Sequence, residues 1–184
     1  MNNRNVGVDE KAGVLSLENS GTMRLFRFTF LSAIVLASPL VFSQPITGSF
    51  VNAALFLSAS FFGFRKESFV IAVVPSVVAL ATGQLPMAFA PLVPFIMTGN
   101  LLLVYLAAFG FEKGKNYFVM AASAAVAKSA LLFAVGVTFS GTLYSGTAVA
   151  GKMLAMFGWL QLATALAGAV IAFGVLRILR REER

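Results

Sequence analysis

The sequence predicts an all-α integral membrane protein with six transmembrane helices and both termini in the cytoplasm. Three observations predict this fold class. Hydrophobic residues make up 59% of the 184 residues and charged residues only 11%, which is too apolar for a soluble domain and sufficient for about six spans of about 20 residues each. The apolar residues form six runs separated by short links. The basic residues gather at the chain ends and at alternate links.

The six apolar runs set the expected helices and the domain limits. A polar tail of mixed charge, residues 1–23, precedes them and is expected to be disordered and cytoplasmic. The transmembrane domain follows at residues 24–180, and residues 181–184 form a basic cytoplasmic end. The expected segments, good to a few residues at each end, are Leu25–Phe42, Ser49–Phe64, Phe69–Thr82, Leu92–Phe111, Tyr117–Thr138 and Met153–Leu176.

The first run has a second interpretation, which is a cleaved signal peptide. The region before it is long and contains Asp9, Glu10 and Glu18, and no clear Ala-x-Ala cleavage site follows it. Both features are atypical of signal peptides. We therefore expect a retained helix.

The positions of the charges set the orientation of the chain. Of the 14 Lys and Arg residues, 12 lie in the N-terminal flank, the second and fourth links and the C-terminal flank, which share one side of a six-span chain. All seven acidic residues fall on that side as well. Cytoplasmic loops carry the excess of Lys and Arg in membrane proteins, so this side is expected to face the cytoplasm of a cell membrane. Only Lys128 and Lys152 lie elsewhere.

The composition also excludes several function classes. The chain has no Cys and no His, which excludes thiol nucleophiles, thiolate and imidazole metal sites and His-based catalytic triads. No acidic residue falls within an expected span, so a carboxylate proton relay and an acidic magnesium site lack their parts. The basic residues lie at membrane borders rather than in a nucleic-acid-binding patch. We therefore expect no enzyme, metal, cofactor or nucleic-acid partner.

Lys128 is the one charge at the centre of an expected span. It lies roughly 16 Å from either end of the segment Tyr117–Thr138. A lysine at that depth costs at least about 3 kcal/mol on insertion scales unless it faces a protein interior or a wet cavity. A snorkelling lysine is the alternative, but the central depth favours a functional residue.

A few other side chains lie at or near the depth of Lys128. With it they suggest one pocket, open to the outside, in which a cation and several amides bind a small organic anion beside an aromatic wall. The alternative is that the amides only hold helices together. Lys152 lies at an interface, where lysine commonly snorkels. The candidate residues, besides Lys128, are Asn52, Gln84, Asn100, Trp159, Gln161 and Thr164.

The first segment contains two small residues four positions apart, Ala33 and Ala37. Such pairs let another helix approach closely. Taken alone, this pattern favours ordinary internal packing over a partner surface, because similar pairs occur elsewhere in the chain.

These features together resemble the S component of an energy-coupling factor (ECF) transporter. The resemblance covers about residues 24–180. It is carried by six spans with both ends inside, by Ala33-x-x-x-Ala37, by the lysine of the fifth segment, and by three short motifs. The motifs are Gly83-Gln-Leu-Pro86, Ala90-Pro-Leu-Val-Pro94 and Gly99-Asn100.

The resemblance implies a function and partners. An S component binds a vitamin or related micronutrient from outside and associates with a transmembrane T subunit and two ATPase subunits, which hydrolyse the ATP. It is thought to topple in the membrane to release its cargo inward. In this family an Ala-x-x-x-Ala pattern of the first helix contacts the T subunit, so the resemblance implies this role for Ala33 and Ala37. It also implies that the outer links help to close the pocket. Two other classes stay open: a membrane scaffold or assembly subunit that binds no ligand, and a solitary facilitator or channel.

Overall fold

The computed structural model describes the backbone of residues 6–182 and the side chains of residues 21–179 and 181. Every regular element within this range is helical, which confirms the predicted all-α class. In the tail that the sequence predicted to be disordered, residues 6–23 form the first part of a helix, and residues 1–5 lie outside the described part of the chain. The end predicted at 181–184 falls largely outside the described side chains. The elements are α1 (Val6–Val41), α2 (Gln44–Phe62), α3 (Lys66–Ala81), a 3₁₀ helix η1 (Met87–Leu92), α4 (Val93–Glu112), α5 (Tyr117–Gly141), α6 (Ala148–Phe157) and α7 (Trp159–Glu182).

Five stretches of the described residues are long and apolar enough to cross a membrane, so the chain is a multi-pass membrane protein. The one expected segment outside these five stretches, Phe69–Thr82, corresponds to α3, which has 16 residues and a length of about 24 Å. The hydrocarbon core of a bilayer is about 30 Å thick, so α3 reaches both faces only together with its flanking residues. The five stretches are Gly21–Val41, Gln44–Phe62, Met87–Glu112, Tyr117–Gly141 and Ala148–Leu179.

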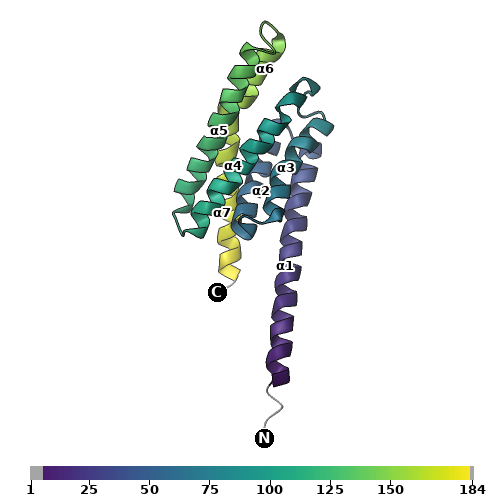
Figure 1. Ribbon diagram of the computed structural model, residues 1–184, viewed down its shortest axis with the longest axis vertical. Helices are drawn as coiled ribbons and strands as arrows, with labels where there is room; N and C mark the ends of the chain where they lie inside the picture. The colour runs from purple at the N-terminus through teal and green to yellow at the C-terminus, as the bar shows by residue number, and fades with distance from the viewer. Residues whose placement is uncertain (1–5, 183–184) are drawn as a thin grey trace.

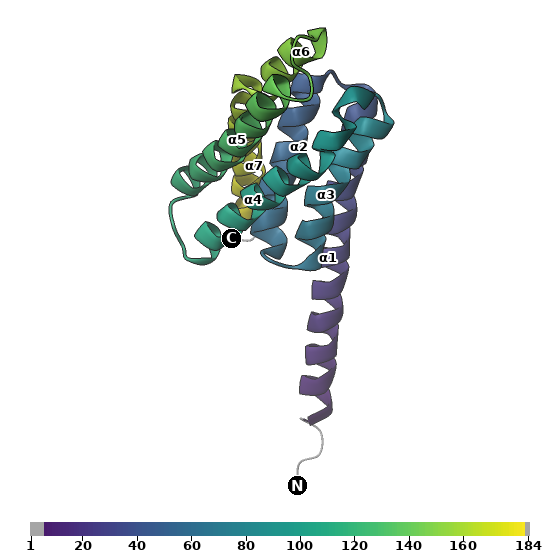
Figure 2. The same ribbon diagram turned by 45° about the horizontal axis from the view of Figure 1, so that its top comes forward.

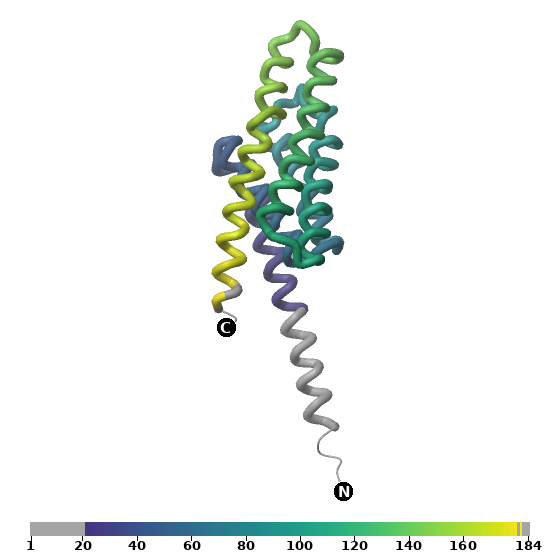
Figure 3. The backbone as a smooth tube through the Cα atoms, turned by 90° about the vertical axis from the view of Figure 1, so that its left-hand side faces the viewer, coloured from purple at the N-terminus to yellow at the C-terminus, as the bar shows by residue number. Residues whose placement is uncertain are grey.

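The helices run up and down in one bundle, and the links alternate between its two ends. The α2–α3 link, the α4–α5 link and the end of α7 lie together at the lower end in Figure 1, and the other links lie at the upper end. Arg24 of α1 donates to Glu67 of α3, which places the start of α3 beside the middle of α1. Figure 3 shows α5 beside α6 and the first half of α7, and Tyr117 at the start of α5 donates to the backbone oxygen of Ala169 in the middle of α7. The α2–α3 and α4–α5 links, which carry basic residues, therefore lie at the same end of the bundle.

Helix α2 lies in the middle of the bundle and packs against α1, α3, α4 and α7 (Figure 2). It begins earlier than predicted, at Gln44, because Pro45 stands in its first turn. The N–H groups of a first turn have no partner within the helix, so the missing N–H of proline costs no hydrogen bond there. Gly168 of α7 lets the two helices approach closely, since a Cβ there would lie 2.6 Å from the Cβ of Asn52 and 2.7 Å from the backbone N of Ala53. The close contact fixes the position of Asn52 relative to α7.

Two clusters of buried apolar side chains hold the bundle. The larger one joins α1, α2, α3, α4, α5 and α7. The smaller one joins η1, the start of α4 and the C-terminal halves of α5 and α6, and includes Phe89 and Phe157. Tyr144, between α5 and α6, donates to the backbone oxygen of Ala88 in η1. This bond joins the α5–α6 link to η1 at the upper end of the bundle.

The last predicted segment, Met153–Leu176, is interrupted in the structure. It consists of the end of α6 and most of α7, and the two helices meet at Gly158. A Cβ at this position would lie 2.6 Å from the backbone oxygen of Leu154, so the break requires glycine. The prediction of one continuous helix was wrong here, because a single glycine in an apolar run gives no clear stop signal.

Candidate functional site

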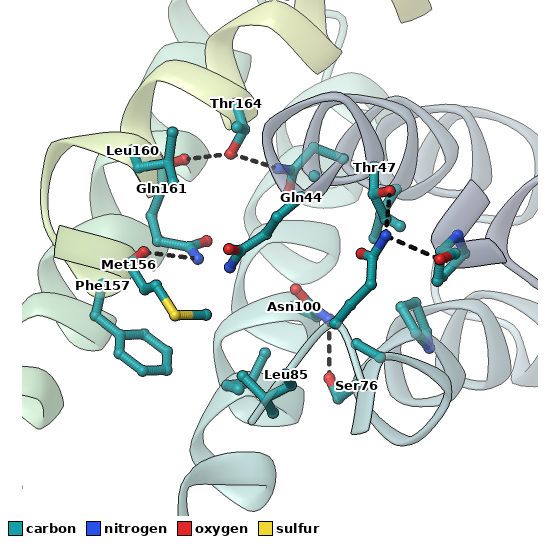
Figure 4. Close-up of a pocket in the computed structure, with 18 of the residues that line it drawn as sticks. Gln44, Thr47, Ser76, Leu85, Asn100, Met156, Phe157, Leu160, Gln161 and Thr164 are labelled. Atoms are coloured by element: carbon teal, nitrogen blue, oxygen red, sulfur yellow. Dashed lines mark hydrogen bonds between the residues drawn. The ribbon is translucent and has the colours of Figure 1, made fainter. Parts of the chain in front are cut away.

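A cavity of about 110 Å³ lies within the upper part of the bundle (Figure 4). Its lining comes from the end of α1, from α2 to α7 and from the link after α3. Six of the seven predicted binding residues line it, so the structure brings together side chains that are up to 112 positions apart in the sequence. The six are Asn52, Gln84, Asn100, Lys128, Gln161 and Thr164.

Lys128 is buried, with 3% of its surface exposed, and its ammonium points toward α2. The Nζ atom donates a hydrogen bond of 2.6 Å to Oδ1 of Asn52. The Nδ2 atom of Asn52 donates in turn to Oγ1 of Thr164 at 3.4 Å. That hydroxyl donates to the backbone oxygen of Gln161 at 3.2 Å. The chain of bonds uses both ends of the Asn52 amide and fixes the direction of the lysine side chain.

No carboxylate balances the charge of Lys128 within the described residues. The one ion pair among them joins Arg24 and Glu67, at the lower end of the bundle. An ammonium has three N–H donors, and only one of those of Lys128 has a partner in the described part of the chain. The remaining donors and the unbalanced charge favour an anion beside Lys128.

Asn100 and Gln84 are each held by a backbone oxygen of a neighbouring helix. The Nδ2 atom of Asn100 donates to the backbone oxygen of Ala72 at 2.9 Å. The Nε2 atom of Gln84 donates to the backbone oxygen of Pro39 at 2.9 Å and to Oγ1 of Thr47 at 3.2 Å. Each amide therefore joins two parts of the bundle and also lines the cavity. The sequence left open whether the amides form a pocket or hold helices together, and these two residues do both.

Trp159 does not line the cavity. It is the first residue of α7, just after the break at Gly158, and it is 75% exposed. The break turns its side chain outward, so it forms no aromatic wall for the site. Phe157, one position before the break and 1% exposed, lines the cavity instead.

Gln44 and Thr47 also line the cavity and were missed from the sequence. They stand in a stretch that reads as a link, Ser43–Gly48, but the structure places them in the first turns of α2. The available signal was Pro45, which is favoured in the first turn of a helix. A helix predicted to begin at this proline would have included Thr47 and placed Gln44 at its start.

No family model, curated protein or solved structure matches this chain. Among the described residues, no group of three or more acidic, His or Cys side chains could hold a metal ion. The polar groups that the cavity does offer are one ammonium, several side-chain amides and hydroxyls, set among apolar side chains such as Leu85 and Leu160. This arrangement suits a small organic molecule with a negative charge.

Proposed function

We propose that this chain is the substrate-binding S component of an ECF-type importer and that its cavity binds a small organic anion. The observation that carries the proposal is the hydrogen bond from the buried Lys128 to Asn52. No Asp or Glu of the described part of the chain lines the cavity around this lysine. A buried cation of this kind costs free energy unless a partner compensates it. A bound anion supplies that compensation, and it gives a reason for placing a lysine at this depth.

The topology that we propose has six spans with both termini in the cytoplasm. Support comes from the alternation of the links, which groups the α2–α3 and α4–α5 links with the end of α7 (Figure 1). The sequence carries Arg65, Lys113, Lys115 and Arg177 in these parts. The positive-inside rule then assigns this end to the cytoplasm and the cavity to the outer half of the membrane. In this topology α3 crosses the membrane with help from its flanking residues.

The T subunit and the two ATPase subunits are the proposed partners, and α1 is the proposed T-subunit contact. Ala33 and Ala37 are both exposed in the single chain, so neither is used for packing within the bundle. They lie on an outer face of α1 that also carries Phe26, Phe30 and Leu40. Small residues on an exposed face allow a second helix to approach closely.

Native mass spectrometry of the purified full-length protein tests the proposed binding function. We expect a small anion to be retained through purification and to be released when the protein unfolds. Co-expression with a T subunit and its ATPases should yield a complex of all the subunits. A retained ligand without partners would favour a solitary facilitator, and partners without any ligand would favour a scaffold or assembly subunit.

A further inference from the structure

Three side-chain amides around the cavity share one orientation, in which the NH₂ group donates to a backbone oxygen. Asn100 donates to Ala72 at 2.9 Å, and Gln84 donates to Pro39 at 2.9 Å. Gln161 donates to the backbone oxygen of Met156 at 3.2 Å. A backbone carbonyl can only accept hydrogen bonds, so an amide oxygen cannot take the place of these NH₂ groups. The orientation of each amide is therefore set by its neighbour.

The side-chain oxygens of the same three amides are left free. No hydrogen bond within the described part of the chain engages Oδ1 of Asn100, Oε1 of Gln84 or Oε1 of Gln161. All three residues line the cavity. Figure 4 shows the side chains of Asn100 and Gln161 directed into the space that they line. The cavity thus presents acceptors from three different elements of the bundle.

Asn52 differs from these three amides. Its Oδ1 atom accepts from Lys128 and its Nδ2 atom donates to Thr164. Both ends of this amide are occupied, so it positions the lysine. The free groups of the cavity then include one cationic donor, at Lys128, and the three amide oxygens. Gln44 also lines the cavity, and no hydrogen bond within the described part of the chain engages either end of its amide.

We infer, on the basis of the proposed anion-binding function, that the ligand carries N–H or O–H donors in addition to its negative group. A simple alkyl carboxylate would satisfy Lys128 and would leave three amide oxygens without water and without partners. Displacing water by a group that cannot reproduce its hydrogen bonds lowers the affinity of a ligand. A carboxylate that bears hydroxyl or amide N–H groups satisfies the cation and the acceptors together. The substrate class is therefore a hydroxylated or amide-bearing organic acid.

The size of the cavity adds to this description. An apolar cavity of about 150 Å³ accepts a benzene molecule, and the cavity here measures about 110 Å³. The part of the ligand that enters it is consequently compact. Its donors must lie close to its negative group in order to reach acceptors that line the same small space.

Matched pairs of acids test the inference on the purified full-length protein in detergent. Pantoate, which has two hydroxyl groups, is compared with 3,3-dimethylbutyrate, which lacks them. Pantothenate is compared with octanoate. Calorimetry and thermal unfolding are used to measure binding. We expect the donor-bearing member of a pair to bind at least about tenfold more tightly, the equivalent of one well-formed hydrogen bond.

A variant shows whether an amide oxygen causes this difference. Gln161→Leu removes one acceptor and should weaken the donor-bearing acid about tenfold while leaving the donor-free acid unchanged. Thr98→Leu, an exposed polar residue of α4 outside the cavity, should change neither affinity. If Gln161→Leu does not fold, the comparison of the paired acids on the unchanged protein decides the matter.

The outcomes separate this inference from the proposed function. Equal or tighter binding of the donor-free acids would overturn the inference and leave anion binding intact. Equally tight binding of pantothenol, a neutral alcohol that keeps the donors of pantothenate and has a hydroxyl group in place of its carboxylate, would remove the need for an anion and overturn the proposed function. Failure of all the acids to bind would count against both.

Discussion

The Nζ atom of Lys128 lies 2.6 Å from Oδ1 of Asn52. The two residues are 76 positions apart, on α5 and α2, and both are almost fully buried, at 3% and 2% exposed. An amide oxygen carries only a partial charge, so it orients the ammonium without neutralising it. The pair thus holds an uncompensated cation at a fixed point of the cavity, and the effects of changing either residue follow from that arrangement.

Replacing Lys128 with methionine should abolish most of the anion affinity and leave the protein folded. Truncating one member of a buried charged pair costs about 2–5 kcal/mol in binding, or about 30-fold or more in the dissociation constant. For folding, loss of the buried charge offsets loss of the Asn52 partner, so the thermal midpoint should change by about 5 °C at most. Calorimetry with the retained ligand and thermal unfolding measure the two effects.

Lys152→Met provides the matched control, because Lys152 is exposed on α6 and does not line the cavity. This variant should bind the anion as the unchanged protein does. Equal affinities for the unchanged protein and the Lys128 variant would remove the lysine from the site.

Replacing Asn52 with aspartate should also prevent anion binding, but by a different route. The carboxylate would stand where Oδ1 accepts from Lys128 and would form a buried ion pair, so the lysine would no longer attract an external anion. We expect an affinity at least about tenfold lower and a thermal midpoint that is unchanged or higher. Isothermal titration and a melting curve suffice as measurements. Stronger anion binding by this variant would contradict the assigned role of Lys128.

The sequence predicted the all-α membrane class, and it predicted six polar residues of the cavity but not Gln44, Thr47 or Ser76. Lys128 and Asn100 stand out in apolar runs because a polar side chain there is costly, and the structure places both in one cavity. The same argument could not find Leu85, Leu160 or Phe157. Apolar lining residues look like any other core residue until the helices are placed side by side.

The errors came from local backbone geometry. Trp159 follows Gly158, and the break at that glycine turns the tryptophan outward. Gln44 lies in a stretch with the composition of a link, but Pro45 allows the helix to begin there. In both places a single residue determines which way the chain turns, and the periodicity of apolar residues carries no information about it.

Adding a methyl group to Gly168 should destabilise the bundle, although alanine is the better helix former. The new Cβ would lie 2.6 Å from the Cβ of Asn52 and 2.7 Å from the backbone N of Ala53, so α2 and α7 must separate. Overpacking of this kind costs about 1–3 kcal/mol. Gly174→Ala on the same helix has nothing within 4 Å of the added carbon and should be neutral or stabilising by up to about 1 kcal/mol. Thermal unfolding of both variants tests the close approach of α2 and α7. An equal change of the unfolding midpoint in the two variants would exclude it.

The absence of cysteine from the chain makes the proposed topology simple to test. Lys66→Cys and Met87→Cys place one exposed thiol on each side of α3. A membrane-impermeant maleimide applied to intact cells should label position 87 and should reach position 66 only after permeabilisation. Ser145→Cys, in the exposed α5–α6 link, serves as the positive control for the outer face. Labelling of positions 66 and 87 from the same side would mean that α3 does not cross and would exclude six spans.

Replacing both Ala33 and Ala37 with leucine should block transport and leave ligand binding unchanged. The two alanines are exposed on α1, and neither lines the cavity, so larger side chains can be accommodated in the isolated subunit. They would keep a partner helix from approaching closely. The matched control is the double change Ala130→Leu and Ala134→Leu, an exposed pair with the same spacing on α5. Co-purification with the T subunit and uptake by cells should fail only for the α1 variant, whereas both variants should keep the dissociation constant of the unchanged protein. Loss of ligand binding in the α1 variant would instead show that these alanines support the fold of the chain itself.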